Sequence, residues 1–219
     1  SCAGDRNQAS IIFDLAKQMV LLDPLLSSKA KVFRNSITFP AKGNTYKVLS
    51  SDASLQHGHN PNAILFDELH TQKSRELFDT MQTGTGARNQ PLLFTMTTAG
   101  ASKTDGNICW EVHSYSEKVK NKTINDDTHL SVIYSAEEGA DIQDPETWKK
   151  ANPNFGISIN EDYLITEAKK ASELPSYENT FRRLHLNQWT TSITKWISDS
   201  VWMENFEEID LEILKGRKC

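Results

Sequence analysis

The sequence predicts an α/β fold in which a parallel sheet is followed by a mainly helical region. Residues 63–66 and 91–96 are short apolar runs of the kind that forms strands buried on both faces. A helical pattern lies between them, and strand–helix–strand is the unit from which parallel sheets are built. Beyond Gly100 most of the periodic segments are helical. We therefore assign residues 1–105 to a sheet-containing domain and residues 106–219 to a mostly helical linker region.

The first fifty residues predict one helix and a pair of strands. Asp5 can cap a helix whose apolar residues recur at helical spacing until Asp23-Pro24. Residues 32–39 and 46–49 are then rich in β-branched and aromatic residues, and the segment between them has the composition of a turn. A pair of strands is expected there.

The central segment predicts the parallel unit in detail. The strand at 63–66 follows a polar loop, a helix is expected over 73–81 with Gly84 and Gly86 at its end, and the second buried strand runs over 91–96. The helical region should contain a strand at 130–134 and the helices 108–119, 145–151, 161–172 and 177–186. Three tryptophans near the end could form buried core or a partner surface, namely Trp189, Trp196 and Trp202.

Composition places the chain among ordinary globular proteins. Of 219 residues, 37% are hydrophobic and 24% charged, which argues against disorder. A net charge of -5 argues against a surface that is basic throughout, of the kind that binds nucleic acid nonspecifically. The three cysteines show no paired spacing, so a reducing cytoplasm fits best. No apolar run approaches the ~18 residues that would predict a membrane span.

Two acids follow the first buried strand directly. Four apolar residues and then Asp67-Glu68 form the Walker B pattern of a RecA-like P-loop ATPase sheet, which brings the acids to the edge where such sheets bind ligands. Asp67 could hold Mg²⁺ through water, and Glu68 could orient and deprotonate the water that attacks the γ-phosphate of ATP. The alternative is a strand that simply runs out into solvent.

Small hydroxyl residues follow the second strand, in the segment Thr97-Thr98-Ala99-Gly100. Their side chains could bond toward a phosphate or report the nucleotide state to the next domain. Because successive parallel strands end at one edge, we expect this segment beside Asp67 and Glu68. His70, just after the acids, is expected to contact the nucleotide edge.

These motifs resemble the large terminase subunit of tailed bacteriophages. The most specific matches are residues 60–70, 83–92 and 97–100, and further similarity covers residues 5–9 and 182–189. The resemblance implies an ATP-driven, homo-oligomeric motor in the host cytoplasm. With a small terminase subunit and the portal protein, it would pack double-stranded DNA into the capsid, and its metal-dependent nuclease domain would cut concatemeric DNA.

The same resemblance implies roles for individual residues. Asp67 matches the magnesium-associated acid and Glu68 the catalytic glutamate. The segment from Thr97 through Thr98 to Gly100 matches the coupling motif, whose residues are also expected to bind the nucleotide. Arg88 is a candidate phosphate contact that would act on a neighbouring subunit. The simpler alternative for Arg88 is a loop cation.

One family feature is missing, because no G-x-x-x-x-G-K-[ST] occurs in the sequence. The chain starts at Ser1 without methionine and ends at Cys219, so we expect an internal fragment, with the phosphate-binding loop upstream and the nuclease downstream. ATP and Mg²⁺ would then belong to the parent protein, and the fragment alone should be inactive. The alternatives are a helicase-like ATPase fragment, since Asp67-Glu68-Leu69-His70 resembles a helicase box, and a non-enzymatic linker that binds DNA or portal.

Overall fold

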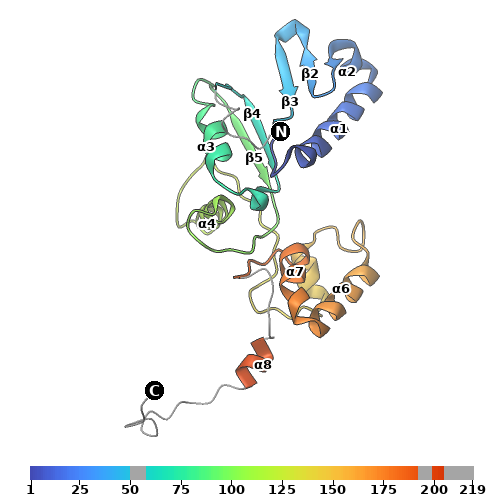
Figure 1. Cartoon of the computed structure of the whole chain (residues 1–219), viewed down its shortest axis with the longest axis vertical. Coiled ribbons are helices and arrows are strands. Elements are labelled where there is room, and N and C mark those ends of the chain that lie inside the picture. Colours follow the sequence, from blue (N-terminus) through green and yellow to red (C-terminus); the bar gives the residue numbers. More distant parts are fainter. Residues whose placement is uncertain (50–57, 192–198, 205–219) are drawn as a thin grey trace.

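The computed structural model describes residues 1–49, 58–191 and 199–204. Three parts follow one another along the molecule, an N-terminal helix with a small antiparallel sheet, a central parallel pair of strands, and a helical region (Figure 1). Each part has its own buried apolar cluster. No described helix is both long enough and apolar enough to cross a membrane.

The N-terminal part begins with α1 (Arg6–Leu22), and the Asp5 carboxylate accepts the Gln8 N–H at 3.1 Å. The predicted helix and its cap are confirmed. After it come α2 (Pro24–Lys29) and an antiparallel sheet in the order β1, β2, β3, made of Lys31–Val32, Ser36–Phe39 and Asn44–Lys47. The predicted turn contains the 3-10 helix η1 (Pro40–Lys42), and α2 was not predicted.

The parallel unit is confirmed. Strand β4 (Ala63–Asp67) pairs in parallel with β5 (Leu92–Met96), and α3 (Glu76–Thr83) connects them. Helix α3 starts three residues later than expected and ends at Thr83, with Gly84 as its C-cap. On the other side of β4 the backbone of Cys2 donates to Leu65 and accepts from Asp67, at 2.7 and 2.9 Å.

One prediction for this sheet is wrong, because β5 is not buried on both faces. Leu92, Phe94 and Met96 point to one side of the strand and are a third to a half exposed. Side chains alternate along a strand, so Leu93 points to the opposite face, where it packs on the central apolar cluster with residues of α3 and α4 (Ile108–Lys120). Only that face of β5 is covered within the described part of the chain.

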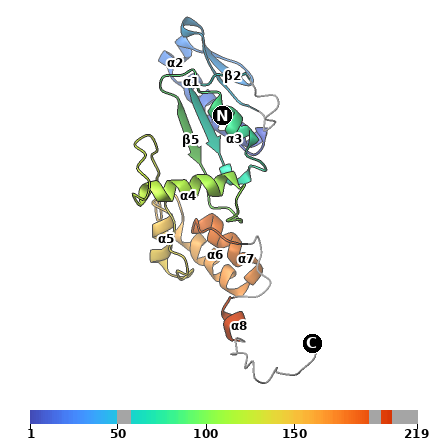
Figure 2. The same cartoon turned by 90° about the vertical axis from the view of Figure 1, so that its left-hand side faces the viewer.

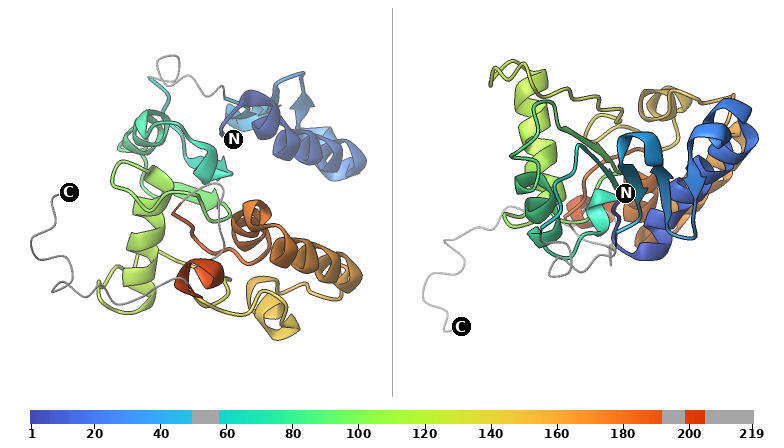
Figure 3. Two further views of the ribbon diagram at one scale, coloured as in Figure 1. Left: turned by 60° about the horizontal axis from the view of Figure 1, so that its bottom comes forward. Right: turned by 90° about the horizontal axis from the view of Figure 1, so that it is seen from above.

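The helical region contains α4, α5 (Pro145–Ala151), α6 (Glu161–Glu173) and α7 (Pro175–His185), as predicted, and then α8 (Asp199–Glu204). Side-chain caps begin three of these helices, from Asn107, Asp144 and Asn160. Helix α4 lies across the end of the parallel strands in Figure 2, while α6 and α7 pack side by side (Figure 3). Their core is formed by four fully buried side chains, those of Trp148, Leu164, Phe181 and Leu186.

The strand predicted at residues 130–134 is absent, since this described segment has no regular secondary structure and no ladder partner. Its alternating apolar residues face outward, and Leu130 is 89% exposed. β-Propensity needs a neighbouring strand to take effect, and none lies here among the described residues. Of the tryptophans, Trp189 packs on the central cluster, Trp202 is 63% exposed, and Trp196 lies outside the described residues.

Candidate nucleotide edge at the end of the parallel strands

The acidic pair lies at the carboxyl end of β4, where the chain turns sharply. Asp67 is the last residue of the strand, and its Oδ1 accepts the Glu68 N–H at 3.0 Å. Glu68 has φ 50° and ψ 51°, a left-handed conformation that costs a non-glycine residue roughly 1 kcal/mol or more. The 3-10 helix η3 (Leu69–Thr71) follows it, and both the N–H and the hydroxyl of Thr71 donate to the Glu68 carbonyl at 2.8 Å. Buried Leu69 anchors this turn.

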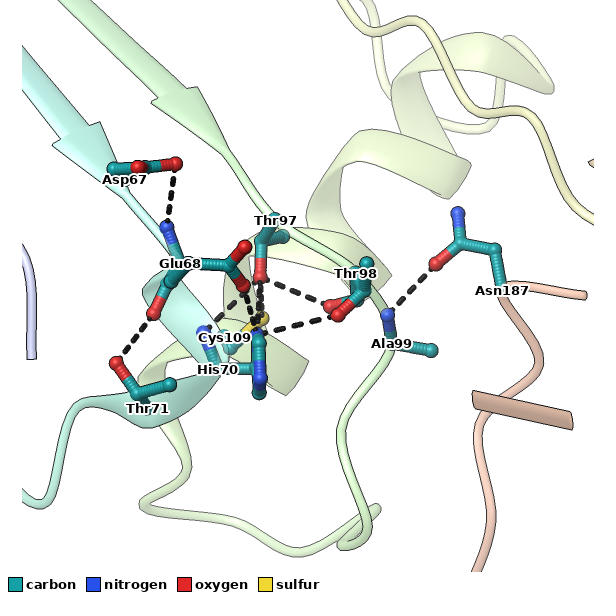
Figure 4. A network of polar contacts seen from close by, with 9 residues as sticks. All are labelled: Asp67, Glu68, His70, Thr71, Thr97, Thr98, Ala99, Cys109 and Asn187. Carbon is teal, nitrogen blue, oxygen red and sulfur yellow. Dashed lines mark hydrogen bonds and ion pairs between the residues drawn. The ribbon is translucent and has the colours of Figure 1, made fainter. Parts of the chain in front are cut away.

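The turn brings His70 against both sequence motifs (Figure 4). Its Nδ1 lies 3.0 Å from Oε2 of Glu68 and 3.1 Å from the hydroxyl oxygen of Thr97. The backbone N–H of His70 also donates to that hydroxyl oxygen at 3.1 Å. His70 therefore joins the acid after β4 to the hydroxyl residue after β5.

The hydroxyl residues complete the cluster. The Thr97 hydroxyl donates to the Thr98 carbonyl at 2.9 Å, and Oγ1 of Thr98 lies 3.4 Å from Nδ1 of His70. Asp67 and Met96 are register partners, so the residues that follow them necessarily leave the same edge of the sheet. The expectation that both motifs share one edge is confirmed, whereas the roles of their residues remain predictions.

Burial sets the electrostatics of this cluster. Removal from water lowers the pKa of His70, an effect opposed first by the nearby Glu68 carboxylate, so burial favours the neutral ring. Burial also raises the pKa of the Cys109 thiol to about 11, although a contact from Sγ to the Thr97 hydroxyl, at 3.7 Å, acts in the opposite direction. The Cys109 thiol is thus a buried, neutral and unreactive neighbour of Thr97.

The rest of the hydroxyl segment contacts the helical region. The Ala99 N–H donates to Oδ1 of Asn187 at 2.7 Å, and Nδ2 of Asn187 donates to the Tyr134 carbonyl at 2.7 Å. A Cβ on Gly100 would lie 2.7 Å from the Trp189 ring. Sequence analysis did not identify Asn187 or Trp189 as site residues. They lie within residues 182–189, whose family similarity was the only signal available.

Arg88 lies elsewhere. Its Nε and Nη2 donate to the carbonyl of Asn60 at 3.0 and 2.6 Å, in the loop before β4. This is the amino end of the strands, and five residues of strand separate it by about 16 Å from the acids. The structure does not bring Arg88 to the Asp67 edge of its own chain. A contact to a neighbouring subunit remains a prediction beside the simpler role of a loop cation.

The acids offer oxygen ligands of the kind Mg²⁺ prefers. One oxygen of Asp67 accepts a hydrogen bond within the turn, and the side chain of Glu68 is 38% exposed. Across residues 1–49, 58–191 and 199–204 there is no cluster of three or more metal-ligating His, Cys, Asp or Glu side chains. The Asp67 carboxylate, with one oxygen not used by the turn, is the kind of oxygen donor that would hold a magnesium ion through its bound waters.

Comparison with known proteins identifies the class. Residues 1–118 match the family model of the terminase large subunit ATPase domain, and residues 123–219 match the model of its endonuclease domain. The chain belongs to the terminase large subunit family. This membership decides for the terminase prediction over the helicase-like alternative. The endonuclease match covers most of the region that the sequence predicts as a linker.

Individual relatives agree with this assignment. The large terminase subunit of Enterobacteria phage HK97 is 35% identical over 208 residues, covering 92% of this chain and 40% of the relative. The protein YmfN of Escherichia coli strain K12 is 31% identical over 163 residues, which cover 74% of this chain and 35% of the length of YmfN. The crystal structure of the HK97 large terminase superimposes with a TM-score of 0.72 at 33% identity, covering 92% of this chain and 41% of that one. The chain thus spans about two fifths of the HK97 relative's length.

Proposed function

We propose that this chain supplies the metal- and water-directing half of the ATPase site in a motor that packages double-stranded DNA into phage capsids. One observation carries the proposal. Asp67 and Glu68 lie at the same sheet edge as Thr97, His70 contacts both Glu68 and Thr97, and the terminase ATPase model matches this part of the chain. That edge is where open α/β sheets bind nucleotides.

Each residue has a defined task in this proposal. Asp67 would hold a magnesium ion through its bound waters, and the ion would supply positive charge beside the transferred phosphoryl group. Glu68 orients the attacking water and accepts its proton. A phosphate-binding loop is required as well, so we propose that residues 1–219 alone do not turn over ATP and bind neither ATP nor Mg²⁺ tightly.

The segment from Thr97 to Gly100 is the proposed coupling element. The Thr97 hydroxyl oxygen accepts a hydrogen bond from the backbone N–H of His70, in the turn that follows the two acids. Ala99 and Gly100 contact Asn187 and Trp189. A displacement at the nucleotide edge therefore has a continuous covalent and hydrogen-bonded route to α7. We assign residues 1–105 to the ATPase domain and residues 106–219 to the region that links this domain to the nuclease activity.

The wider assignment follows from the family. We propose double-stranded DNA, the portal protein and a small terminase subunit as partners, a homo-oligomeric motor, and the host cytoplasm as its location. Cleavage of concatemeric DNA would be the second activity, in keeping with the endonuclease match at residues 123–219.

A chimaera tests the ATPase assignment. Residues 1–118 of this chain replace the matching segment of the HK97 phage large terminase, and Mg²⁺-dependent ATP hydrolysis is measured. We expect Glu68→Gln and Asp67→Asn each to lower turnover at least about 100-fold, the scale of a lost general base. Glu76→Gln, on an exposed turn of α3, is the matched control and should leave turnover unchanged. Full turnover in the Glu68→Gln chimaera would refute the assignment.

A further inference from the structure

The contact between His70 and Glu68 assigns a residue that the Walker B pattern does not include. We propose that His70 is a positioning residue, whose Nδ1–H holds the Glu68 carboxylate in the orientation that directs the attacking water. The proposal rests on the proposed ATPase function. In this proposal His70 acts through the Glu68 carboxylate, which lies 3.0 Å from its Nδ1.

The backbone fixes the place of the His70 ring. Its N–H donates to the Thr97 hydroxyl oxygen, so the start of η3 is tied to the end of β5. The side chain is only 18% exposed, and its Nδ1 lies 3.0 Å from Oε2 of Glu68. The ring is therefore a rigid partner for the Glu68 side chain, which is 38% exposed.

The hydrogen-bond network selects one tautomer of the ring. The Thr97 hydroxyl gives its hydrogen to the Thr98 carbonyl and accepts the backbone N–H of His70, so it has no hydrogen left for Nδ1. The Glu68 carboxylate can only accept. The bond to Glu68 requires the hydrogen on Nδ1, and the oxygens of Thr97 and Thr98, at 3.1 and 3.4 Å, can only share that hydrogen, an assignment that follows from the network. A bond between this donor and a carboxylate is charge-assisted and hence among the stronger ones.

The need for such a partner follows from the length of glutamate. Its three rotatable bonds would let an unrestrained carboxylate sample many orientations, and a general base works only when aimed at its proton. The left-handed backbone of Glu68 points the side chain back toward η3, where Nδ1 of His70 meets it. Asparagine places an amide N–H close to where histidine has Nδ1, whereas leucine keeps the bulk and loses the donor.

The chain itself permits a direct spectroscopic test. In ¹⁵N-labelled residues 1–219 at pH 7.5, long-range ¹H–¹⁵N correlations should show Nδ1 protonated and Nε2 unprotonated for His70. Glu68→Ala should shift the Nδ1 resonance, and the distant matched control Glu76→Ala should not. An Nε2-protonated ring, or a Nδ1 resonance indifferent to Glu68→Ala, would overturn the proposal without bearing on the ATPase assignment.

Kinetics of the chimaera described above test the consequence. We expect His70→Leu to lower kcat about 10-fold, the rate equivalent of one charged hydrogen bond, with KM for ATP unchanged, and His70→Asn to restore most of kcat. Unchanged kcat in His70→Leu, while Glu68→Gln abolishes turnover, would refute the role of His70 alone. Turnover that survives Glu68→Gln would instead refute the proposed function on which it rests.

Discussion

The side-chain oxygen of Asn187 accepts a hydrogen bond from the backbone N–H of Ala99 at 2.7 Å, across 88 positions of sequence. It joins the loop after β5 to a residue two positions beyond the end of α7. Asn187 also has φ 51°, a left-handed conformation that asparagine tolerates better than most residues. One side chain thus connects the candidate nucleotide edge to the helical region.

Asn187→Gly should destabilise the chain by about 1–3 kcal/mol, because it leaves the part-buried Ala99 N–H without its acceptor. Glycine is chosen because it accepts the positive φ without strain. Urea denaturation followed by tryptophan fluorescence measures the change. The matched control is Lys122→Gly, at an exposed residue with φ 58°, which should be neutral or slightly stabilising. Equal behaviour of both variants would show that the Asn187 bond contributes nothing.

Gly100→Ala should destabilise by about 1–3 kcal/mol, since its Cβ would lie 2.7 Å from the Trp189 ring. Gly86→Ala is the control, because its Cβ would meet only the Thr83 carbonyl at an ordinary 3.5 Å. In a double-mutant cycle, Trp189→Leu should remove most of the cost of Gly100→Ala. Additive effects of the two substitutions would contradict a direct clash.

Glu68→Gly should be more stable than Glu68→Ala by about 1 kcal/mol, because both remove the side chain and only glycine relieves the left-handed backbone. Asp79, inside α3, provides the opposite comparison, as Asp79→Gly should be less stable than Asp79→Ala by about 1 kcal/mol. Thermal and urea unfolding measure both pairs. The same order in both pairs would argue that Glu68 stores no strain.

Cys109 should make stability depend on alkaline pH. Burial raises the pKa of its thiol from 9.0 to about 11, so the folded state favours the neutral form. Its stabilisation is complete below pH 9 and is lost as the pH rises from 9 to 11. Comparison with Cys109→Ala isolates this contribution in urea titrations across that range.

Thiol chemistry gives a second readout. At pH 8 the native Cys109 should be alkylated far more slowly than in urea, as mass spectrometry of its peptide can show. Native labelling at the unfolded rate would contradict the buried, neutral thiol.

Local patterns predicted most of the secondary structure. Helical periodicity located α1 and α4 through α7 to within a few residues, and two apolar runs located β4 and β5. The shared edge of Asp67 and Thr97 also followed, because parallel strands end on the same side. The two wrong predictions concern features that depend on neighbouring elements of the fold. Residues 130–134 have the residue types of a strand but no partner, and β5 has an apolar face that no described element covers.

The sequence by itself thus determined the order of elements, the acidic pair after β4 and the hydroxyl segment after β5, since these depend on residues a few positions apart. Only the tertiary structure decided that His70 meets Glu68, that Arg88 lies at the opposite end of the strands, and that Ala99 bonds to Asn187. These contacts depend on how a turn or a distant helix packs against the sheet edge. For Arg88 and Ala99 this packing is decided by burial over much of the chain. For His70 and Glu68, two residues apart, it is decided by the left-handed turn that the contact with Thr97 holds in place.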